Sequence, residues 1–279
     1  RDKIDPEWRI YGRSAGDDKA PIITILNAVD ALQSSKIGFT SNIKLFFEGE
    51  EEAGSTNLKA HLLNNKNLLD DIDIWLFCDG PVHQSRRPQL VFGVRGVTGM
   101  EVTVYGATRA LHSGHYGNWA PVPGQMLARL IASMKNEDGK VLIENFYDTV
   151  EPLSEFERLE LAKIPNVDMQ LKNELGLAFT EGEGRTINER LLLPSLTIKG
   201  LASGNVGKKA RNVIPNTATT AIGVRLVKGN DPEDMLDKVE SHIRKQGYHI
   251  VYTEPDMETR LKYRKIAKVD RRGSGYIAS

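Results

Sequence analysis

Residues 98 to 106 read TGMEVTVYG, and in this stretch apolar and polar side chains alternate. Such alternation is typical of a β-strand with one buried face, because successive side chains of a strand point to opposite sides of the sheet. The preceding VFGVRG (91 to 96) continues the pattern, and LLLPSLTIKGL (191 to 201) and TATTAIGVRLV (217 to 227) also favour strands. Together these stretches predict a half-buried sheet in the second part of the chain.

Two helices are predicted beside these strands. One extends from about Pro121 to Lys135, and the other covers DPEDMLDKVESHIRKQG (231 to 247) and ends at Gly247, a residue type that often closes a helix. A charged, helix-prone segment (145 to 176) lacks a clear apolar stripe, so we interpret it as a surface excursion. This order of elements predicts an α+β layer, with helices on one face of an antiparallel sheet.

The first part of the chain has a different pattern. PIITILNAVDALQS (21 to 34) and NLKAHLLNNKNLL (57 to 69) predict helices, whereas IKLFF (43 to 47) and DIWLFC (73 to 78) predict short apolar strands. Strands alternating with helices are typical of a mainly parallel sheet with covering helices. We therefore predict an α/β domain up to about residue 95, followed by the α+β domain.

Composition narrows the class of protein. The chain has 279 residues, 40% of them hydrophobic, which is enough for two domains. Lys plus Arg and Asp plus Glu both number 37, so no charge excess points to nucleic acid or a membrane surface as a partner. The single cysteine, Cys78, cannot form an internal disulfide, and we expect a reducing, cytoplasmic location.

The acidic run FEGEEEAGS (47 to 55) places three glutamates between an apolar stretch and a glycine turn. Taken alone, such a run is most often a solvated loop. However, GDDK (16 to 19) precedes the first predicted helix and Asp79 follows the second predicted strand. Ligands of open α/β sheets bind at the carboxyl ends of the strands, so we expect these carboxylates to converge there. They would repel one another unless positive charge, such as a pair of divalent metal ions, lay among them.

Five motifs in this order resemble those of the aminoacylase and carnosinase-type dizinc metallopeptidases, and most closely the carnosinase-like dipeptidase branch. They are YGRSAGDDKAP (11 to 21), FEGEEEAGS (47 to 55), FCDGP (77 to 81), the pair GVRG and LHSG (93 to 96 and 111 to 114), and NVIPNTATTAIGVRLVKGNDP (212 to 232). The resemblance implies an α/β catalytic domain, of which residues 1–95 form part, and an inserted α+β lid or dimerisation domain (96–255) that forms a homodimer. It also implies a segment (256–279) that returns towards the catalytic domain. It also implies hydrolysis of an amide bond in a dipeptide or N-acyl amino acid.

The resemblance implies a role for each matching acidic residue. Asp17 matches the carboxylate that bridges two zinc ions, and its peptide bond to Asp18 is often cis in the family. Glu52 matches a ligand of one zinc and Asp79 a ligand of the other, with Mn²⁺ or Co²⁺ as alternative metals. Glu51 matches the general base, which takes a proton from water and later delivers it to the leaving amine.

Three residues of the second domain match substrate-binding positions. His112 matches a histidine that reaches a substrate carbonyl or developing oxyanion, commonly in the partner subunit's active site. Asn212 and Arg225 match residues that hold the substrate's carbonyl and carboxylate, and an arginine suits a carboxylate because its planar fork makes two parallel hydrogen bonds. From residue type alone, a polar turn residue and a surface arginine remain open alternatives. Glu50 and His115 have no such match, so we expect a solvated carboxylate and a structural histidine.

The family has two further zinc ligands, both histidines, one upstream of DDK and one downstream of the lid. Neither matches a residue of these 279. Histidine is the usual nitrogen ligand of zinc, so three carboxylates alone would make a weak site. We therefore expect an internal portion of a longer enzyme, truncated at both ends and inactive by itself. The alternative is a non-catalytic homologue or fragment that acts as a dimerising or binding module.

Overall fold

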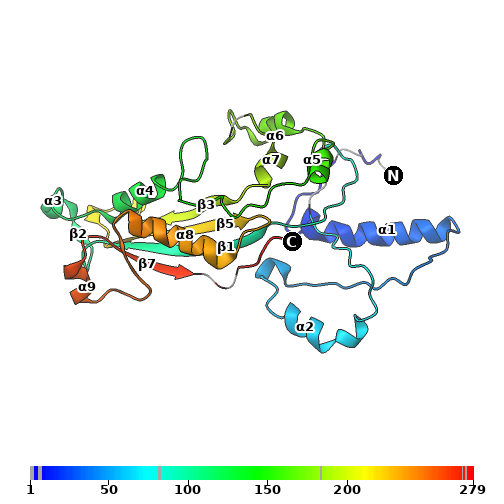
Figure 1. Cartoon of the computed structure of the whole chain (residues 1–279), viewed down its shortest axis with the longest axis horizontal. Helices are drawn as coiled ribbons and strands as arrows, with labels where there is room; N and C mark the ends of the chain where they lie inside the picture. Colours follow the sequence, from blue (N-terminus) through cyan, green and yellow to red (C-terminus); the bar gives the residue numbers. More distant parts are fainter. Residues whose placement is uncertain (1–2, 6–7, 81–82, 183, 272, 274) are drawn as a thin grey trace. The chain divides into compact units, whose positions relative to one another are not determined.

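The computed structural model describes residues 3–5, 8–80, 83–182, 184–271, 273 and 275–279. The chain divides into two compact units, Arg1–Gln89 (unit 1) and Leu90–Ser279 (unit 2), and each is described here by itself (Figure 1). The division falls close to the boundary predicted near residue 95.

Unit 2 is built on a five-stranded sheet in the order β3-β5-β1-β7-β6. Its strands are β1 (Gly96–Tyr105), β3 (Ser195–Ala202), β5 (Thr217–Leu226), β6 (His249–Val251) and β7 (Ile266–Arg271). The central strand β1 pairs with β5 in an antiparallel register that extends from Gly96↔Leu226 to Tyr105↔Thr217. Within the described strands, β6 and β7 run parallel and the other neighbours in this sheet run antiparallel. The strands predicted from TGMEVTVYG and TATTAIGVRLV are therefore confirmed.

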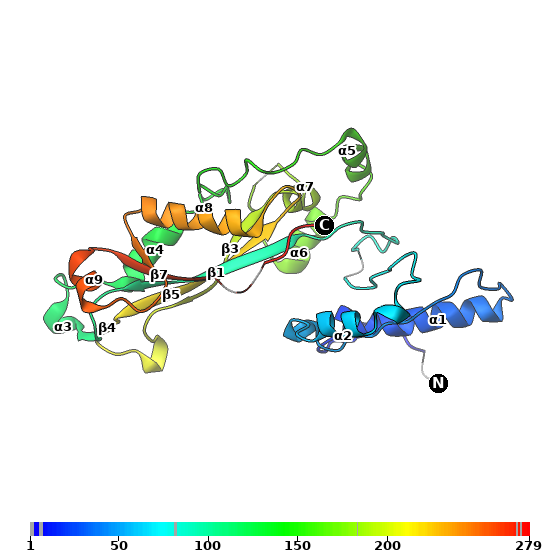
Figure 2. The same ribbon diagram turned by 60° about the horizontal axis from the view of Figure 1, so that its bottom comes forward.

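Two helices, α4 (Pro123–Ala132) and α8 (Pro232–Lys245), cover one face of this sheet (Figure 2). Alternate residues of β1 point towards them, as Met100, Val102 and Val104 are all buried in one apolar core. The helices contribute Leu127, Leu130, Met235, Leu236, Val239 and Ile243 to this core, and Met134 joins it just after α4. Pro232 at the start of α8 has no N–H to satisfy there, and the Asp231 side chain accepts from two backbone N–H groups of the first turn. The predicted α+β layer is thus present.

Smaller elements surround the sheet of unit 2. A two-stranded ribbon of β2 (Leu111–His112) and β4 (Val213–Ile214) leads into α3 (Ser113–Tyr116). The remaining helices are α5 (Glu155–Leu161), α6 (Asp168–Leu175), α7 (Ile187–Leu191) and α9 (Met257–Lys262). α5 and α6 lie in the predicted excursion and have no buried residue. None of the helices within the described ranges has both the length and the apolar character needed to cross a bilayer.

The end of the chain adds strand pairing to unit 2. Strand β7 pairs with β1 on one side and with β6 on the other. Further along, Tyr276 pairs with Val97, and the N–H of Ser279 donates to the carbonyl of Val94 at 3.1 Å. Strand β7 was not predicted, because these strand contacts join residues far apart in the sequence and leave little trace in a basic local pattern. The return of 256–279 towards the first domain stays a prediction.

Unit 1 contains the two predicted helices, α1 (Ala20–Ser34) and α2 (Leu58–Asn64). Its described residues form no β-strand. The strands predicted at 43–47 and 73–78 are therefore wrong for this structure, and so is the parallel sheet built from them. A strand needs a hydrogen-bonded neighbour as well as an apolar pattern. Without one, these segments leave large side chains in solvent, with Phe47 59% and Leu76 79% exposed.

Candidate active site

The acidic run of unit 1 forms a loop that its own side chains brace. Glu48 accepts from the N–H of Glu50 at 2.8 Å and from the hydroxyl of Ser55 at 3.2 Å. Glu50 in turn accepts from the backbone N–H and side-chain amide of Asn57 at 3.2 and 2.9 Å. Glu50 is therefore more than a solvated carboxylate, since it ties the loop to the start of α2.

Glu51 and Glu52 begin a single 3₁₀ turn (Glu51–Ala53) within this loop, and both are exposed. The turn ends at Gly54, whose φ of 92° lies in the left-handed region that glycine adopts without steric cost. The carboxylate of Glu52 pairs with the guanidinium of Arg13 at 2.7 Å. Both partners are exposed, so this pair adds little stability, but it brings the segment before α1 beside the acidic loop.

Asp17 lies in that segment, in an irregular turn (Ala15–Lys19) that precedes α1. Asp17 and Asp18 both have non-helical backbone angles, and the peptide bond between them is cis, as the resemblance implies. Neither carboxylate is buried. The kink therefore presents two adjacent acidic side chains at the amino-terminal end of the helix.

The candidate carboxylates are close enough to shift one another's pKa. Partial loss of water raises the pKa of Glu51, and the charges of Asp79, Glu52 and Asp17 raise it further. Loss of water also raises the pKa of Asp79, followed by the charges of Asp17 and Asp18 and a hydrogen bond with Asp17. Both side chains remain exposed, so water screens much of this repulsion. The three acidic clusters thus lie near one another, and among the described residues of unit 1 no sheet edge assembles them.

The candidate carboxylates of unit 1 have the chemistry of some, but not all, of the ligands that a metal site needs. Divalent cations bind carboxylate oxygens, and positive charge would relieve the repulsion that raises these pKa values. Asp17, Glu52 and Asp79 could therefore supply oxygen ligands. However, wherever the structure describes the chain, no three His, Cys, Asp or Glu side chains come close enough together to hold a metal ion. The cluster supplies ligands of the expected chemistry without forming a closed site.

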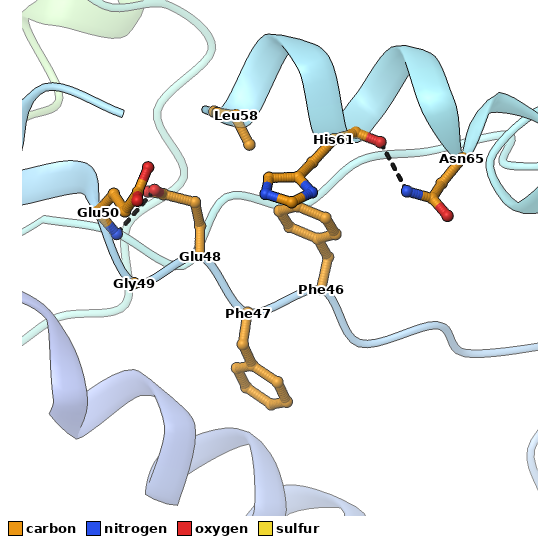
Figure 3. Close-up of a pocket in the computed structure, with 8 residues that line it drawn as sticks. All are labelled: Phe46, Phe47, Glu48, Gly49, Glu50, Leu58, His61 and Asn65. Carbon is orange, nitrogen blue, oxygen red and sulfur yellow. Dashed lines mark hydrogen bonds between the residues drawn. The ribbon is translucent and has the colours of Figure 1, made fainter. Parts of the chain in front are cut away.

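A cavity of about 350 Å³ lies beside the acidic run in unit 1 (Figure 3). It is lined by Phe46, Phe47, Glu48, Gly49, Glu50, Leu58, His61 and Asn65. Figure 3 shows the ring of His61 beside the ring of Phe46, while Phe47 points to the opposite side of the chain. His61 lies on α2.

In unit 2 the structure brings His112 and Asn212 together. β2 and β4 pair His112 with Val213, and the N–H of Ser113 donates to the carbonyl of Asn212 at 3.0 Å. The Nδ1 atom of His112 accepts from the N–H of Gly114 at 3.1 Å. These contacts hold the His112 imidazole at the end of the two-stranded ribbon, where it is exposed.

Arg225 lies near the other end of the sheet. It pairs with Val97 and Ser195, and it is exposed. The β2–β4 ribbon precedes Thr217, the first residue of β5, and Arg225 lies eight residues further along that strand. At about 3.3 Å per residue this corresponds to roughly 26 Å. One copy of unit 2 therefore does not bring Arg225 near His112.

The sequence interpretation missed a second arginine beside Arg225. Burial lowers the pKa of Arg95, and the positive charge of Arg225 lowers it further, so the two guanidinium groups are near each other. Arg95 is held by the carbonyl of Leu193 at 2.9 Å and the hydroxyl of Ser195 at 3.2 Å. Its position in the motif GVRG was the available signal. Two adjacent guanidinium groups favour binding of an anion such as a carboxylate.

Comparison with known proteins identifies relatives of both units. The chain is 29% identical over 243 residues to mouse Beta-Ala-His dipeptidase, covering 85% of this chain and 49% of that protein. It is 28% identical over 245 residues to the Cys-Gly metallodipeptidase dug1 of Schizosaccharomyces pombe, covering 87% of this chain and 52% of that protein. The chain therefore spans about half the length of the curated relatives it matches.

Solved structures show the same fold. A metallo-carboxypeptidase of the M20 family from Sulfolobus solfataricus, Sso-CP2, aligns with a TM-score of 0.70 and 26% identity over 94% of this chain and 56% of that chain. Human carnosine dipeptidase 1 aligns with a TM-score of 0.76 and 23% identity over 99% of this chain and 56% of that chain. The family model for the peptidase dimerisation domain, M20_dimer, matches residues 92–251. Because this match covers more than half of the 279 residues, the chain belongs to the peptidase dimerisation domain family of the M20 metallopeptidases.

Proposed function

We propose that this chain is part of a dizinc metallopeptidase that hydrolyses an amide bond next to a free carboxylate, in a dipeptide or N-acyl amino acid. The observation that carries the proposal is the gathering of Asp79, Glu52 and Asp17 around Glu51, whose pKa is raised by partial loss of water and further by these three charges. The similarity to a Beta-Ala-His dipeptidase and a Cys-Gly metallodipeptidase supports this substrate class.

Adjacent glutamates take different roles in this proposal. Asp17, Glu52 and Asp79 would supply oxygen ligands to two Zn²⁺ ions, for which Mn²⁺ or Co²⁺ could substitute. The bound metal would supply positive charge that lowers the pKa of water and polarises a carbonyl. The carboxylate of Glu51 accepts a proton from the attacking water and delivers it to the leaving amine. The raised pKa of Glu51 suits this proton transfer, because it brings the proton affinity of the carboxylate closer to that of the attacking water and the leaving amine.

The residues of unit 2 bind substrate in this proposal. His112 donates a hydrogen bond to the substrate carbonyl or the developing oxyanion, and Asn212 contacts the carbonyl as well. Arg225 binds the free carboxylate through its planar fork. The support for Arg225 is its exposed position beside Arg95, where two positive charges favour an anion.

We also propose a homodimer that forms through unit 2. A dipeptide spans roughly 7 Å, whereas His112 and Arg225 are separated by roughly 26 Å or more along β5. If both residues bind one dipeptide, they must come from two copies of the chain. The match to a peptidase dimerisation domain supports this arrangement.

The remaining partner assignments rest on composition. Equal numbers of 37 basic and 37 acidic residues support the absence of nucleic-acid and membrane partners. The single cysteine, Cys78, which is exposed, supports a cytoplasmic location.

The test is hydrolysis of dipeptides by the full-length protein before and after metal removal. We expect cleavage of dipeptides with a free carboxyl terminus, little cleavage of the same peptides as carboxyl-terminal amides, and loss of activity with a chelator that added Zn²⁺ reverses. Equal cleavage of free and amidated dipeptides would contradict the role of Arg225. Full activity after complete metal removal would contradict the metallopeptidase itself.

A second candidate is a non-catalytic module that only dimerises or binds a partner. The lack of a three-ligand metal group among the described residues favours it, and so does the match to the dimerisation domain. Metal analysis separates the two candidates. About two zinc ions per full-length chain would support the enzyme, whereas no zinc after supplementation would support the module.

A further inference from the structure

We propose that Gly114 is a positioning residue for His112, holding the imidazole in place with its proton on Nε2. The catalytic part of this inference rests on the proposed function, in which the Nε2–H group of His112 donates a hydrogen bond to a substrate oxygen. The positioning itself depends only on the structure of unit 2.

The first observation is the hydrogen bond between these two residues. The backbone N–H of Gly114 donates to Nδ1 of His112 at 3.1 Å. A backbone N–H can only donate, so Nδ1 must carry a lone pair and no proton. In a neutral imidazole the single proton then lies on Nε2. The contact therefore selects the tautomer in which Nε2 is the donor.

The second observation is the space that Gly114 leaves for the ring. A Cβ atom at this position would lie 3.0 Å from Cε1 and 3.2 Å from Nδ1 of His112. Both distances are shorter than ordinary van der Waals contact, and the atoms contacted belong to the same ring that accepts the hydrogen bond. Any larger side chain would push the imidazole away from the N–H that orients it.

Backbone conformation does not explain the glycine. Gly114 lies within the short helix α3, and it is not among the glycines with positive φ. Alanine is a better helix former than glycine at such a position. Glycine at position 114 therefore lowers the stability of the helix, but it leaves the space that the His112 imidazole occupies.

His115 limits the ring from another direction. Its centroid lies 4.6 Å from that of His112, with the ring planes tilted by 34°. The imidazole of His112 is thus bounded by the backbone of Gly114 and the ring of His115. This gives His115, which has no role from the resemblance, a place in the same arrangement.

The experiment uses Gly114→Ala in the full-length protein, with Gly200→Ala as the matched control. Gly200 lies in β3 of the same unit and has no positive φ, and a Cβ atom added there would meet no heavy atom within 4 Å. Two-bond ¹H–¹⁵N spectra of histidine-labelled protein report which ring nitrogen carries the proton. Dipeptide hydrolysis is measured on the same samples.

In the wild type and in Gly200→Ala we expect His112 with an unprotonated Nδ1 and a protonated Nε2. In Gly114→Ala we expect this signature to be lost, with a fall in kcat of about 10-fold or more and a smaller change in KM. His112→Asn, which retains a side chain that can cap the helix, should lower kcat by about 100- to 1000-fold.

A protonated Nδ1 in the wild type would overturn the proposal, and so would an unchanged ¹⁵N signature in Gly114→Ala. If the wild type hydrolyses no dipeptide but the spectra change as expected, the positioning role stands and the proposed function fails.

Discussion

The two units of this chain hold their residues in place by different means. Unit 2 packs α4 and α8 onto its sheet around a continuous apolar core. In unit 1, none of the described residues is buried. Its acidic loop is held instead by polar contacts such as those from Glu48 to Ser55 and from Glu50 to Asn57. The apolar core therefore lies in unit 2, whereas the candidate metal ligands and the candidate base lie in unit 1.

The largest expected effect on stability comes from the core of unit 2. Leu236 on α8 is completely buried, so Leu236→Ala should lower the free energy of unfolding by about 2–5 kcal/mol. Leu26 on α1 is 45% exposed, so Leu26→Ala should change the free energy of unfolding by less than about 0.5 kcal/mol. Denaturant unfolding followed by circular dichroism measures both. Equal destabilisation by the two variants would contradict the difference in packing between the units.

A smaller effect is expected where unit 2 takes part in substrate binding. Arg225→Gln removes a charged donor from the proposed carboxylate site, so KM for a dipeptide should rise by about 10- to 100-fold. Arg264, another exposed arginine of unit 2, is the control, and Arg264→Gln should leave KM unchanged. Steady-state kinetics provide the measurement. If both variants bind substrate as the wild type does, Arg225 is a surface residue only.

The smallest effect concerns pH and a buried histidine of unit 2. His242 on α8 is 8% exposed and its Nε2 lies 2.9 Å from the hydroxyl of Ser133. Burial lowers the pKa of His242, and the charge of Lys245 lowers it further. The unfolded chain therefore binds this proton more readily, and stability should fall as pH drops below about 6.5.

One proton limits the slope of this loss to about 1.4 kcal/mol per pH unit. His242→Gln should flatten the dependence of unfolding free energy on pH between about 5 and 7. His61→Gln, which changes an exposed histidine of unit 1, should leave it as it is. A steep dependence that survives His242→Gln would assign the effect to another group.

Local patterns predicted the elements that find their partners within unit 2. Alternating apolar and polar side chains predicted β1 and β5, and the spacing of apolar residues after Asp231 predicted α8. β7 escaped prediction because its place between β1 and β6 depends on distant pairing. The apolar segments 43–47 and 73–78 show the converse, since a strand pattern without a described partner gives an exposed extended chain.

The candidate site was predictable to a similar degree. The order of the acidic motifs indicated that Asp17, Glu51, Glu52 and Asp79 would meet, and their effects on pKa agree. The sequence could not reveal that Arg225 and His112 lie at opposite ends of the sheet, because that separation is set by the direction of β5. It also could not show that Gly114 leaves room for an imidazole.

The proposed division of roles between adjacent glutamates is tested by measuring zinc content and dipeptide hydrolysis on the same sample of Glu51→Gln full-length protein. We predict about two zinc ions per chain, as in the wild type, and a rate lower by about 10²- to 10⁴-fold, because a base that binds no metal has been removed. Glu50→Gln is the control, since Glu50 binds Asn57 within the loop and should be dispensable for turnover. Hydrolysis at the wild-type rate by zinc-loaded Glu51→Gln would contradict the proposed mechanism.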